Sequence, residues 1–274
     1  MDRDHALLDG HRIPAIGFGT WPMDDAQAQA AVRIALHAGY RLLDTAARYG
    51  NERGVGLGLR EAGIAREDVV LTTKLAGADQ GFDGTLRAFD ESLRKLGTDT
   101  VDLYLIHWPL PRVDRYVDSW KAMLRLQQDG RIRSVGVSNF EPVHIERLQA
   151  ETGVLPVVNQ VELHPEFQQP ELRAWLAERA IRVECWSPLG RGGTLRNPVL
   201  QDIARRLGRP VAQVILRWHV QLGLVPIPKS QDPARIAQNL AVDDFALEAA
   251  DMAAIAALDA GRRQGGDPAT HEEF

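Results

Sequence analysis

Short hydrophobic runs alternate with longer segments of helical character along the whole chain. The runs are almost continuously apolar, which is typical of parallel strands buried on both faces of a sheet. In the segments between them, hydrophobic residues recur every three or four positions, and several segments end in glycine, a common helix C-cap. We expect strands at Ala15–Phe18, Tyr40–Leu43, Val69–Thr73, Val101–Ile106, Ser134–Val137, Val157–Val161, Arg182–Trp186 and Leu224–Ile227.

Regular alternation of strand and helix predicts a parallel sheet with right-handed crossovers. Eight such strands in a chain of 274 residues favour a closed (β/α)8 TIM barrel over an open sheet. An Asp-Gly turn predicts a small β-hairpin over residues 1–14, before the first barrel strand. Residues 260–274 are Gly-rich and polar, so we expect a flexible C-terminal tail on a single domain that spans residues 1–274.

Composition narrows the classes of partner. The net charge is −5 and no basic stripe is present, which argues against nucleic acid. The N-terminus lacks the apolar core of a signal peptide, and no run approaches the roughly 18 apolar residues that span a bilayer. The single cysteine, Cys185, excludes an internal disulfide and is interpreted as a core residue. We therefore expect a cytoplasmic monomer without a membrane or nucleic-acid partner.

Reactive residues fall at the C-terminal ends of the expected strands, where TIM barrels carry their chemistry. Asp44 ends the second strand and Lys74 ends the third, with Tyr49 on the loop between them. A buried ammonium needs a partner, and Asp44 is the natural one. The pair is either purely structural or it lowers the pKa of Tyr49, which would make that phenol a usable proton donor.

His107 ends the fourth strand. Alone it would be interpreted as a rim or core residue, but beside a Tyr–Lys–Asp cluster it could hydrogen-bond a substrate carbonyl as a neutral imidazole. The four residues together suit carbonyl reduction, and since none of them carries hydride, a nicotinamide cofactor is required. His164 has no partner at ligand spacing, so we expect no metal site.

Further rim residues suit a nicotinamide. Ser138, Asn139 and Gln160 offer donors and acceptors for its carboxamide, and Trp186 offers a plane for stacking. The alternatives are a polar turn at 138–139 and a core role for the tryptophan.

A second cluster near the end of the chain suits an anion. Lys229, Ser230 and Arg235 surround the start of an expected helix, an arrangement that binds phosphate unless it is only a solvated turn. The flexible loop Gly190–Gly193 could lie over a pyrophosphate.

Gly54, Gly56 and Gly58 follow the second strand but do not form a G-x-G-x-x-G phosphate motif. We expect them in the second barrel helix, opened by Asn51 and Glu52, where each costs about 1 kcal/mol relative to alanine.

The chain resembles the aldo-keto reductase superfamily, and most closely its bacterial 2,5-diketo-D-gluconic acid reductases. The segments that carry the resemblance are "GYRLLDTAARYGNE", "TTK", "DLYLIHWP", "VGVSNF", "VNQVELHP", "WSPLGRG" and "PIPKS" followed by "RIAQN", in the family's order and spacing. The resemblance implies an NADP-binding barrel that reduces aldehydes and ketones, with small dicarbonyls, keto-sugar acids or aldehydes as substrates.

The resemblance also implies residue roles. Tyr49 would be the general acid, Lys74 and Asp44 its tuning pair, and His107 the carbonyl-orienting group. The substrate pocket would be formed by Trp21, Tyr49, His107 and Trp108, and Lys229, Ser230 and Arg235 would bind the 2′-phosphate. The expected NADP contacts are Gly19, Thr20, Trp21, Ser138, Asn139, Gln160, Trp186, Ser187, Leu189, Gly190, Lys229, Ser230, Arg235, Gln238 and Asn239.

The chain departs from the family in two places, and its residues also leave two other functions open. Many members carry tyrosine where this chain has Trp186, and the segment after Asp259 is short compared with many animal members. Arg112 and Arg115 would favour an acidic substrate unless they are only solvated charges. The other functions are a Schiff-base aldolase with Lys74 as nucleophile, and a cofactor-binding regulatory module with little turnover.

Overall fold

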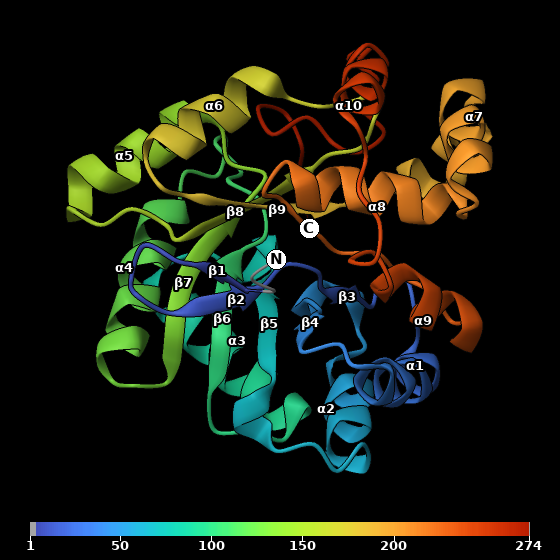
Figure 1. The fold of residues 1–274 in the computed structure, drawn as a ribbon. Helices are drawn as coiled ribbons and strands as arrows, with labels where there is room; N and C mark the ends of the chain where they lie inside the picture. The colour runs from blue at the N-terminus through green and yellow to red at the C-terminus, as the bar shows by residue number, and fades with distance from the viewer. Residues whose placement is uncertain (1–3, 274) are drawn as a thin grey trace.

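The computed structural model describes residues 4–273 and begins with a two-stranded hairpin (Figure 1). Strand β1 (Asp4–Ala6) pairs antiparallel with β2 (Arg12–Pro14), and Gly10 in the turn has a φ of 87°. Leu7 and Ile13 belong to the same buried cluster as inward-facing strand residues, so the hairpin packs against the barrel interior. The predicted hairpin is confirmed for residues 4–14, and residues 1–3 lie outside the described part of the chain.

Within residues 4–273, eight parallel strands form one sheet in the order β10-β9-β8-β7-β6-β5-β4-β3. Backbone hydrogen bonds of 3.0 Å from Gly17 to Pro226 and from Gly19 to Pro228 join the two ends and close the ring. The predicted TIM barrel is confirmed. The strands are β3 Phe18–Gly19, β4 Leu42–Asp44, β5 Val70–Leu75, β6 Val101–Ile106, β7 Ile132–Ser138, β8 Val158–Glu162, β9 Arg182–Trp186 and β10 Val225–Pro226.

Most strands lie where the sequence predicts them, and β6 and β9 match residue for residue. The first and last strands differ, since each pairs over two residues only. Directly after β10, the Ile227 backbone still donates to the Cys185 carbonyl of β9 at 3.0 Å.

Helices connect the strands and enclose the barrel (Figure 1). No helix in residues 4–273 combines the length and hydrophobicity needed to cross a membrane. The helices are α1 Asp25–Ala38, α2 Glu52–Glu61, α3 Phe82–Leu96, α4 Tyr116–Gln128, α5 Pro142–Thr152, α6 Pro170–Glu178, α7 Pro198–Leu207, α8 Val211–Gln221, α9 Pro233–Leu240 and α10 Ala249–Ala256.

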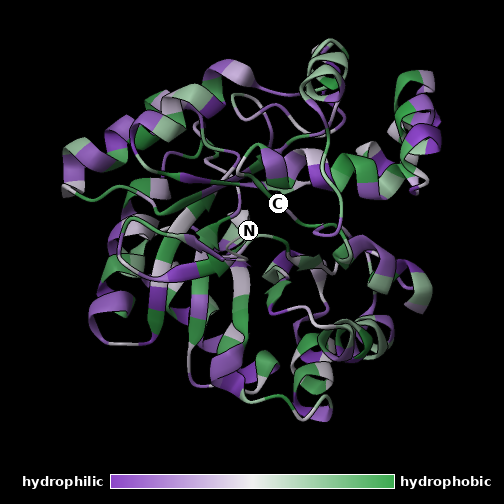
Figure 2. Cartoon of the chain, in the orientation of Figure 1, coloured by the Kyte–Doolittle hydropathy of each residue, from purple (hydrophilic) through white to green (hydrophobic). Residues whose placement is uncertain are grey.

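The strands are buried on both sides, which explains their continuous apolar runs. Leu103 and Leu105 belong to the inner cluster, whereas Tyr104 and Ile106 of the same strand belong to the cluster between strands and helices. Figure 2 shows hydrophobic residues along the strands and mixed character on the surrounding helices. Alternate side chains of each strand therefore fill two different parts of the core.

The three glycines after the second strand lie in α2, as predicted. A Cβ atom on Gly54 would lie 2.0 Å from the carbonyl oxygen of Asp25, and one on Gly56 would lie 2.0 Å from that of Leu96. The backbone of α2 therefore packs directly on α1 and on the end of α3. Close helix packing offsets the low helix propensity of these glycines.

Candidate active site

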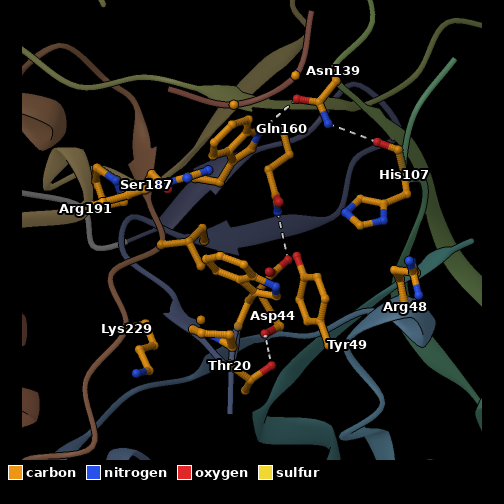
Figure 3. Close-up of a pocket in the computed structure, with 18 of the residues that line it drawn as sticks. Thr20, Asp44, Arg48, Tyr49, His107, Asn139, Gln160, Ser187, Arg191 and Lys229 are labelled. Carbon is orange, nitrogen blue, oxygen red and sulfur yellow. Dashed lines mark hydrogen bonds between the residues drawn. The ribbon is translucent and has the colours of Figure 1, made fainter. Parts of the chain in front are cut away.

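A pocket of about 760 Å³ opens at the rim formed by the C-terminal ends of the strands (Figure 3). Figure 3 shows the Tyr49 hydroxyl and the Asp44 carboxylate below Gln160, with His107 on one side. The sequence-predicted residues that line the pocket are Gly19, Thr20, Trp21, Asp44, Tyr49, His107, Trp108, Asn139, Gln160, Trp186, Ser187, Leu189 and Lys229. The remaining predicted residues, which do not line it, are Lys74, Ser138, Gly190, Ser230, Arg235, Gln238 and Asn239.

Lys74 and Asp44 form a buried ion pair beneath the pocket. The Lys74 Nζ atom lies 2.7 and 2.8 Å from the two Asp44 carboxylate oxygens, and also donates to the Thr45 carbonyl at 3.0 Å. Burial alone would lower the pKa of Lys74, but Asp44 and Tyr49 outweigh it and the pKa is raised. Lys74 therefore remains an ammonium with its hydrogens engaged.

Tyr49 ends a short 3-10 helix, η1 (Ala47–Tyr49), that follows β4. Lys74 Nζ donates to the Tyr49 hydroxyl oxygen at 3.2 Å, which leaves the phenolic hydrogen free to be donated elsewhere. The predicted lowering of the Tyr49 pKa is wrong in its net direction. Burial raises this pKa, and the opposing effect of Lys74 is smaller.

His107 follows β6 and contacts Tyr49 edge to face, with the ring centroids 5.7 Å apart. Its Nδ1 lies 2.6 Å from a carboxylate oxygen of Glu273, whose other oxygen accepts from the Gly77 backbone at 3.0 Å. Burial alone would raise the pKa of Glu273, but the contact with His107 outweighs it and the pKa is lowered. An ionised Glu273 favours a proton on Nδ1, a constraint on the imidazole that the sequence did not predict.

The predicted carboxamide ligands are largely bonded to one another. Asn139 donates to the backbone carbonyl of His107 at 3.0 Å and to the Ser138 hydroxyl at 3.1 Å, and Ser138 donates to the backbone carbonyl of Gln160 at 2.8 Å. The Trp186 indole N–H donates to Asn139 Oδ1 at 2.8 Å. A tyrosine, which many family members carry here, has no ring N–H and could not make this bond to Asn139. This bond fixes the plane of the ring.

The predicted anion cluster lies at the start of α9. Lys229 lines the pocket, while Ser230 accepts from the Asp232 backbone at 3.1 Å. Asp232 caps the helix by accepting from the Arg235 backbone at 3.0 Å. The helix N-terminus thus already has a carboxylate partner, and any anion would have to be bound by the side chains.

Residues 262–273, here called the C-terminal strap, cross the rim. The two carboxylate oxygens of Glu162 accept from the backbone of Gln264 and Gly265, each at 2.7 Å, and His271 stacks on Trp108 with centroids 4.0 Å apart. The sequence predicted a flexible tail on the surface, whereas the structure packs this segment over the pocket. Glycine-rich composition gave no indication of these contacts, because their partners belong to distant strands.

Some pocket residues were missed by the sequence analysis. The additional charged or ionisable side chains that line the pocket are Arg48, Arg191, His271, Glu272 and Glu273. Arg48 lies inside the motif that contains Asp44 and Tyr49, and that position could have indicated it. The Arg112 guanidinium lies 3.3 Å from Glu272, so it is paired within the chain. Within residues 4–273, no group of three or more His, Cys, Asp or Glu side chains is arranged to hold a metal ion.

Comparisons with known proteins agree with this geometry. The aldo/keto reductase family model matches residues 15–260. An aldo-keto reductase of Mycolicibacterium smegmatis is 51% identical over 264 residues, which are 96% of each chain. The methylglyoxal reductase DkgA of Escherichia coli is 47% identical over 264 residues, which are 96% of this chain and 95% of that one.

Solved structures give the same result. An aldo/keto reductase from Brucella melitensis is 52% identical with a TM-score of 0.91, over 93% of this chain and 99% of that chain. A mutant of Gox0644 in complex with NADPH is 47% identical with a TM-score of 0.94, over 98% of each chain. This chain belongs to the aldo/keto reductase family.

Proposed function

We propose that this protein reduces small aldehydes and ketones to alcohols with NADPH, and that Tyr49 donates the proton to the carbonyl oxygen. The observation that carries the proposal is the Lys74 ammonium, which donates to Tyr49 from within a buried ion pair. Family membership supports the reaction class, and the arrangement of charges supports the proposed residue roles.

The proton donor works through two opposing effects on Tyr49. Burial keeps the phenol protonated at neutral pH, as its raised pKa indicates. As the proton leaves, the Lys74 ammonium at 3.2 Å stabilises the phenolate that forms. Asp44 holds Lys74 in place and fixes its direction.

His107 orients the substrate. Its ring lies beside Tyr49 at the pocket, and with Nδ1 facing Glu273 the other ring nitrogen is left for the carbonyl oxygen. This is the orienting role that the sequence suggests for His107.

The residues present fit a nicotinamide cofactor. Gln160 lines the pocket and its side-chain oxygen, Oε1, accepts no hydrogen bond within the described chain, and the indole of Trp186 offers a fixed plane. Lys229, with Arg235 nearby on α9, supplies cationic side chains for phosphate groups. When bound, NADPH supplies the hydride.

The remaining cofactor contacts stay predictions. They are Gly19, Thr20, Trp21, Ser138, Asn139, Ser187, Leu189, Gly190, Ser230, Gln238 and Asn239. A cytoplasmic location and a monomeric state also stay predictions.

A small dicarbonyl such as methylglyoxal is the substrate we propose. Relatives named methylglyoxal reductase share nearly half of their residues with this chain. The walls expected to face the substrate include Trp21, which is half exposed, and Trp108, which His271 covers. A pocket shared with a cofactor leaves room for a compact molecule.

A Schiff-base aldolase is disfavoured. Lys74 has four oxygen partners within 3.2 Å, none of its side chain is exposed, and its raised pKa keeps it protonated. An amine in that state is not a nucleophile. No observation favours the other alternative, a cofactor-binding regulatory module. A measurement of turnover distinguishes that module from an enzyme.

The test is NADPH oxidation with methylglyoxal, followed by absorbance, in wild type and Tyr49→Phe. We expect turnover to be lost in the variant while NADPH still quenches the protein's fluorescence. Tyr104→Phe is the matched control, because that hydroxyl is buried in the core without a hydrogen-bond partner in the described chain. Near-normal turnover in Tyr49→Phe would overturn the assignment, and wild type that binds NADPH without reducing a wide carbonyl panel would favour the regulatory module.

A further inference from the structure

The proposed reaction leaves one buried ionisable group in the barrel without a role. Glu184 lies in β9, none of it is exposed, and its side chain points to the interior beneath the pocket, toward Gln160 of β8. Its Oε2 atom accepts a hydrogen bond from Gln160 at 2.7 Å. Its Oε1 atom has no hydrogen-bond partner within residues 4–273. Burying a carboxyl group with a single hydrogen-bond partner costs free energy, which raises the question of what Glu184 does for that partner, Gln160.

The partner amide is held by two carboxyl groups at once. Gln160 Nε2 donates one hydrogen to Asp44 at 2.8 Å and the other to Glu184 at 2.7 Å (Figure 3 shows the first bond). The bond to Asp44 identifies the nitrogen of the amide, because an oxygen in its place would face the oxygen of a carboxylate that is paired with Lys74.

Two bonds hold the amide more firmly than one. A single hydrogen bond to Asp44 would leave the amide plane free to turn about that bond. The second bond, to Glu184, fixes the plane and therefore the direction of the carbonyl oxygen. That oxygen accepts no hydrogen bond from the described chain, and Gln160 lines the pocket.

The charge on Glu184 follows from its neighbours. Asp44 and Lys74 form a neutral pair nearby, and the adjoining residues of β10, Val225 and Pro226, are apolar. Burial, and then the negative charge of Asp44, raises the pKa of Glu184 to about 8, with Gln160 and Lys74 opposing the shift. At neutral pH Glu184 is therefore a neutral acid, and a neutral carboxyl group costs less free energy to bury with a single hydrogen-bond partner than a charged one does.

We propose that Glu184 is a positioning residue that holds the side-chain amide of Gln160. In this position the Gln160 side-chain oxygen, Oε1, faces the carboxamide N–H of the nicotinamide. Glu184 touches neither cofactor nor substrate, and its effect passes through Gln160. The inference rests on the proposed function, because it requires NADPH to bind in this pocket.

The first test measures NADPH binding by fluorescence quenching. Glu184→Gln retains an oxygen that can accept from Gln160, and we expect its Kd to stay within about twofold of wild type. Glu184→Leu removes the acceptor and should weaken NADPH binding about three- to tenfold, the range for one neutral hydrogen bond. Val183→Ala is the control, since Val183 belongs to the opposite face of the same strand and should bind as wild type does.

Two further measurements keep the proposal falsifiable if the leucine variant folds poorly. Glu184→Asp keeps the carboxyl group but withdraws it by one methylene, and should weaken binding as the leucine variant does. In the cofactor-free protein, the infrared carbonyl band of the protonated Glu184 should be missing from Glu184→Gln and shifted in Gln160→Leu. A band that does not move in Gln160→Leu would overturn the hydrogen bond.

A double-mutant cycle separates this role from general damage to the fold. In a Gln160→Leu background, Glu184→Leu should cause no further loss of NADPH affinity. An equal loss in both backgrounds, or wild-type affinity in both Glu184→Leu and Glu184→Asp, would overturn the proposal. Wild-type protein that fails to bind NADPH at all would instead overturn the proposed function and this inference with it.

Discussion

Lys74→Met separates the structural from the catalytic contribution of the buried ion pair. Lys74 is fully buried and donates to both oxygens of Asp44. Its removal leaves the carboxylate with the Gln160 amide as its remaining side-chain donor. Removing one partner of a buried pair costs about 3–5 kcal/mol, while replacing both partners with uncharged groups is often neutral. We expect Lys74→Met to lose about 3–5 kcal/mol of unfolding free energy at pH 7 and Asp44→Asn/Lys74→Met to recover most of that loss.

Urea unfolding followed by both circular dichroism and fluorescence measures these free energies, and coincident transitions check the two-state assumption. Both variants should lose NADPH-dependent turnover, so stability and activity separate in the double variant. A loss below about 1 kcal/mol in Lys74→Met, as for an exposed pair, or a double variant no more stable than the single one, would refute the reasoning.

Three further changes test other parts of the molecule. Arg235→Ala should weaken NADPH much more than NADH in fluorescence titrations, and equal losses would remove its assignment to the 2′-phosphate. Glu273→Gln should lower kcat/KM by about tenfold, as expected for a hydrogen bond to a charged group. The pKa of Glu273 is lowered in the folded state, so the ionised carboxylate stabilises the fold. This stabilisation should be complete above the unfolded pKa of about 4.3 and should fade as the pH falls below it. The Tm values of wild type and Glu273→Gln should therefore converge in acid. Gly56→Ala should lower Tm, since its Cβ would lie 2.0 Å from a backbone oxygen of α3, and a higher Tm would contradict close packing of α2.

The central part of the site was predictable because the topology of a parallel barrel is regular. Asp44 ends β4, Lys74 is the last residue but one of β5, and His107 follows β6. Because these strands are neighbours, the order of the residues along the chain is also their order around the rim. The strand ends are marked by polar residues directly after apolar runs. Tyr49 could be added because its loop is short and starts at the same rim.

Other features depend on distances that no local pattern encodes. Whether the pKa of Tyr49 is raised or lowered depends on two opposing effects, the burial of the phenol, which raises it, and the nearby Lys74 ammonium, which lowers it. The contact of Glu273 with His107 joins residues from opposite halves of the chain, and Glu273 belongs to a segment whose composition is typical of a surface tail.

Three buried carboxyl groups near the rim show most clearly what the sequence leaves open. Asp44, Glu162 and Glu184 are at most 4% exposed, so each of these carboxyl groups needs partners to offset the cost of its burial. Asp44 faces Lys74. Burial alone would raise the pKa of Glu162, but His164 and two backbone N–H groups of the C-terminal strap outweigh it and the pKa is lowered. Glu184 receives only one amide hydrogen, from Gln160, and its pKa is raised to about 8. The number and charge of the donors therefore decide which acid is ionised, and those donors come from other strands and from the strap. A sequence shows the acids but not their donors, which is why the Asp44 partner could be inferred and the state of Glu184 required the structure.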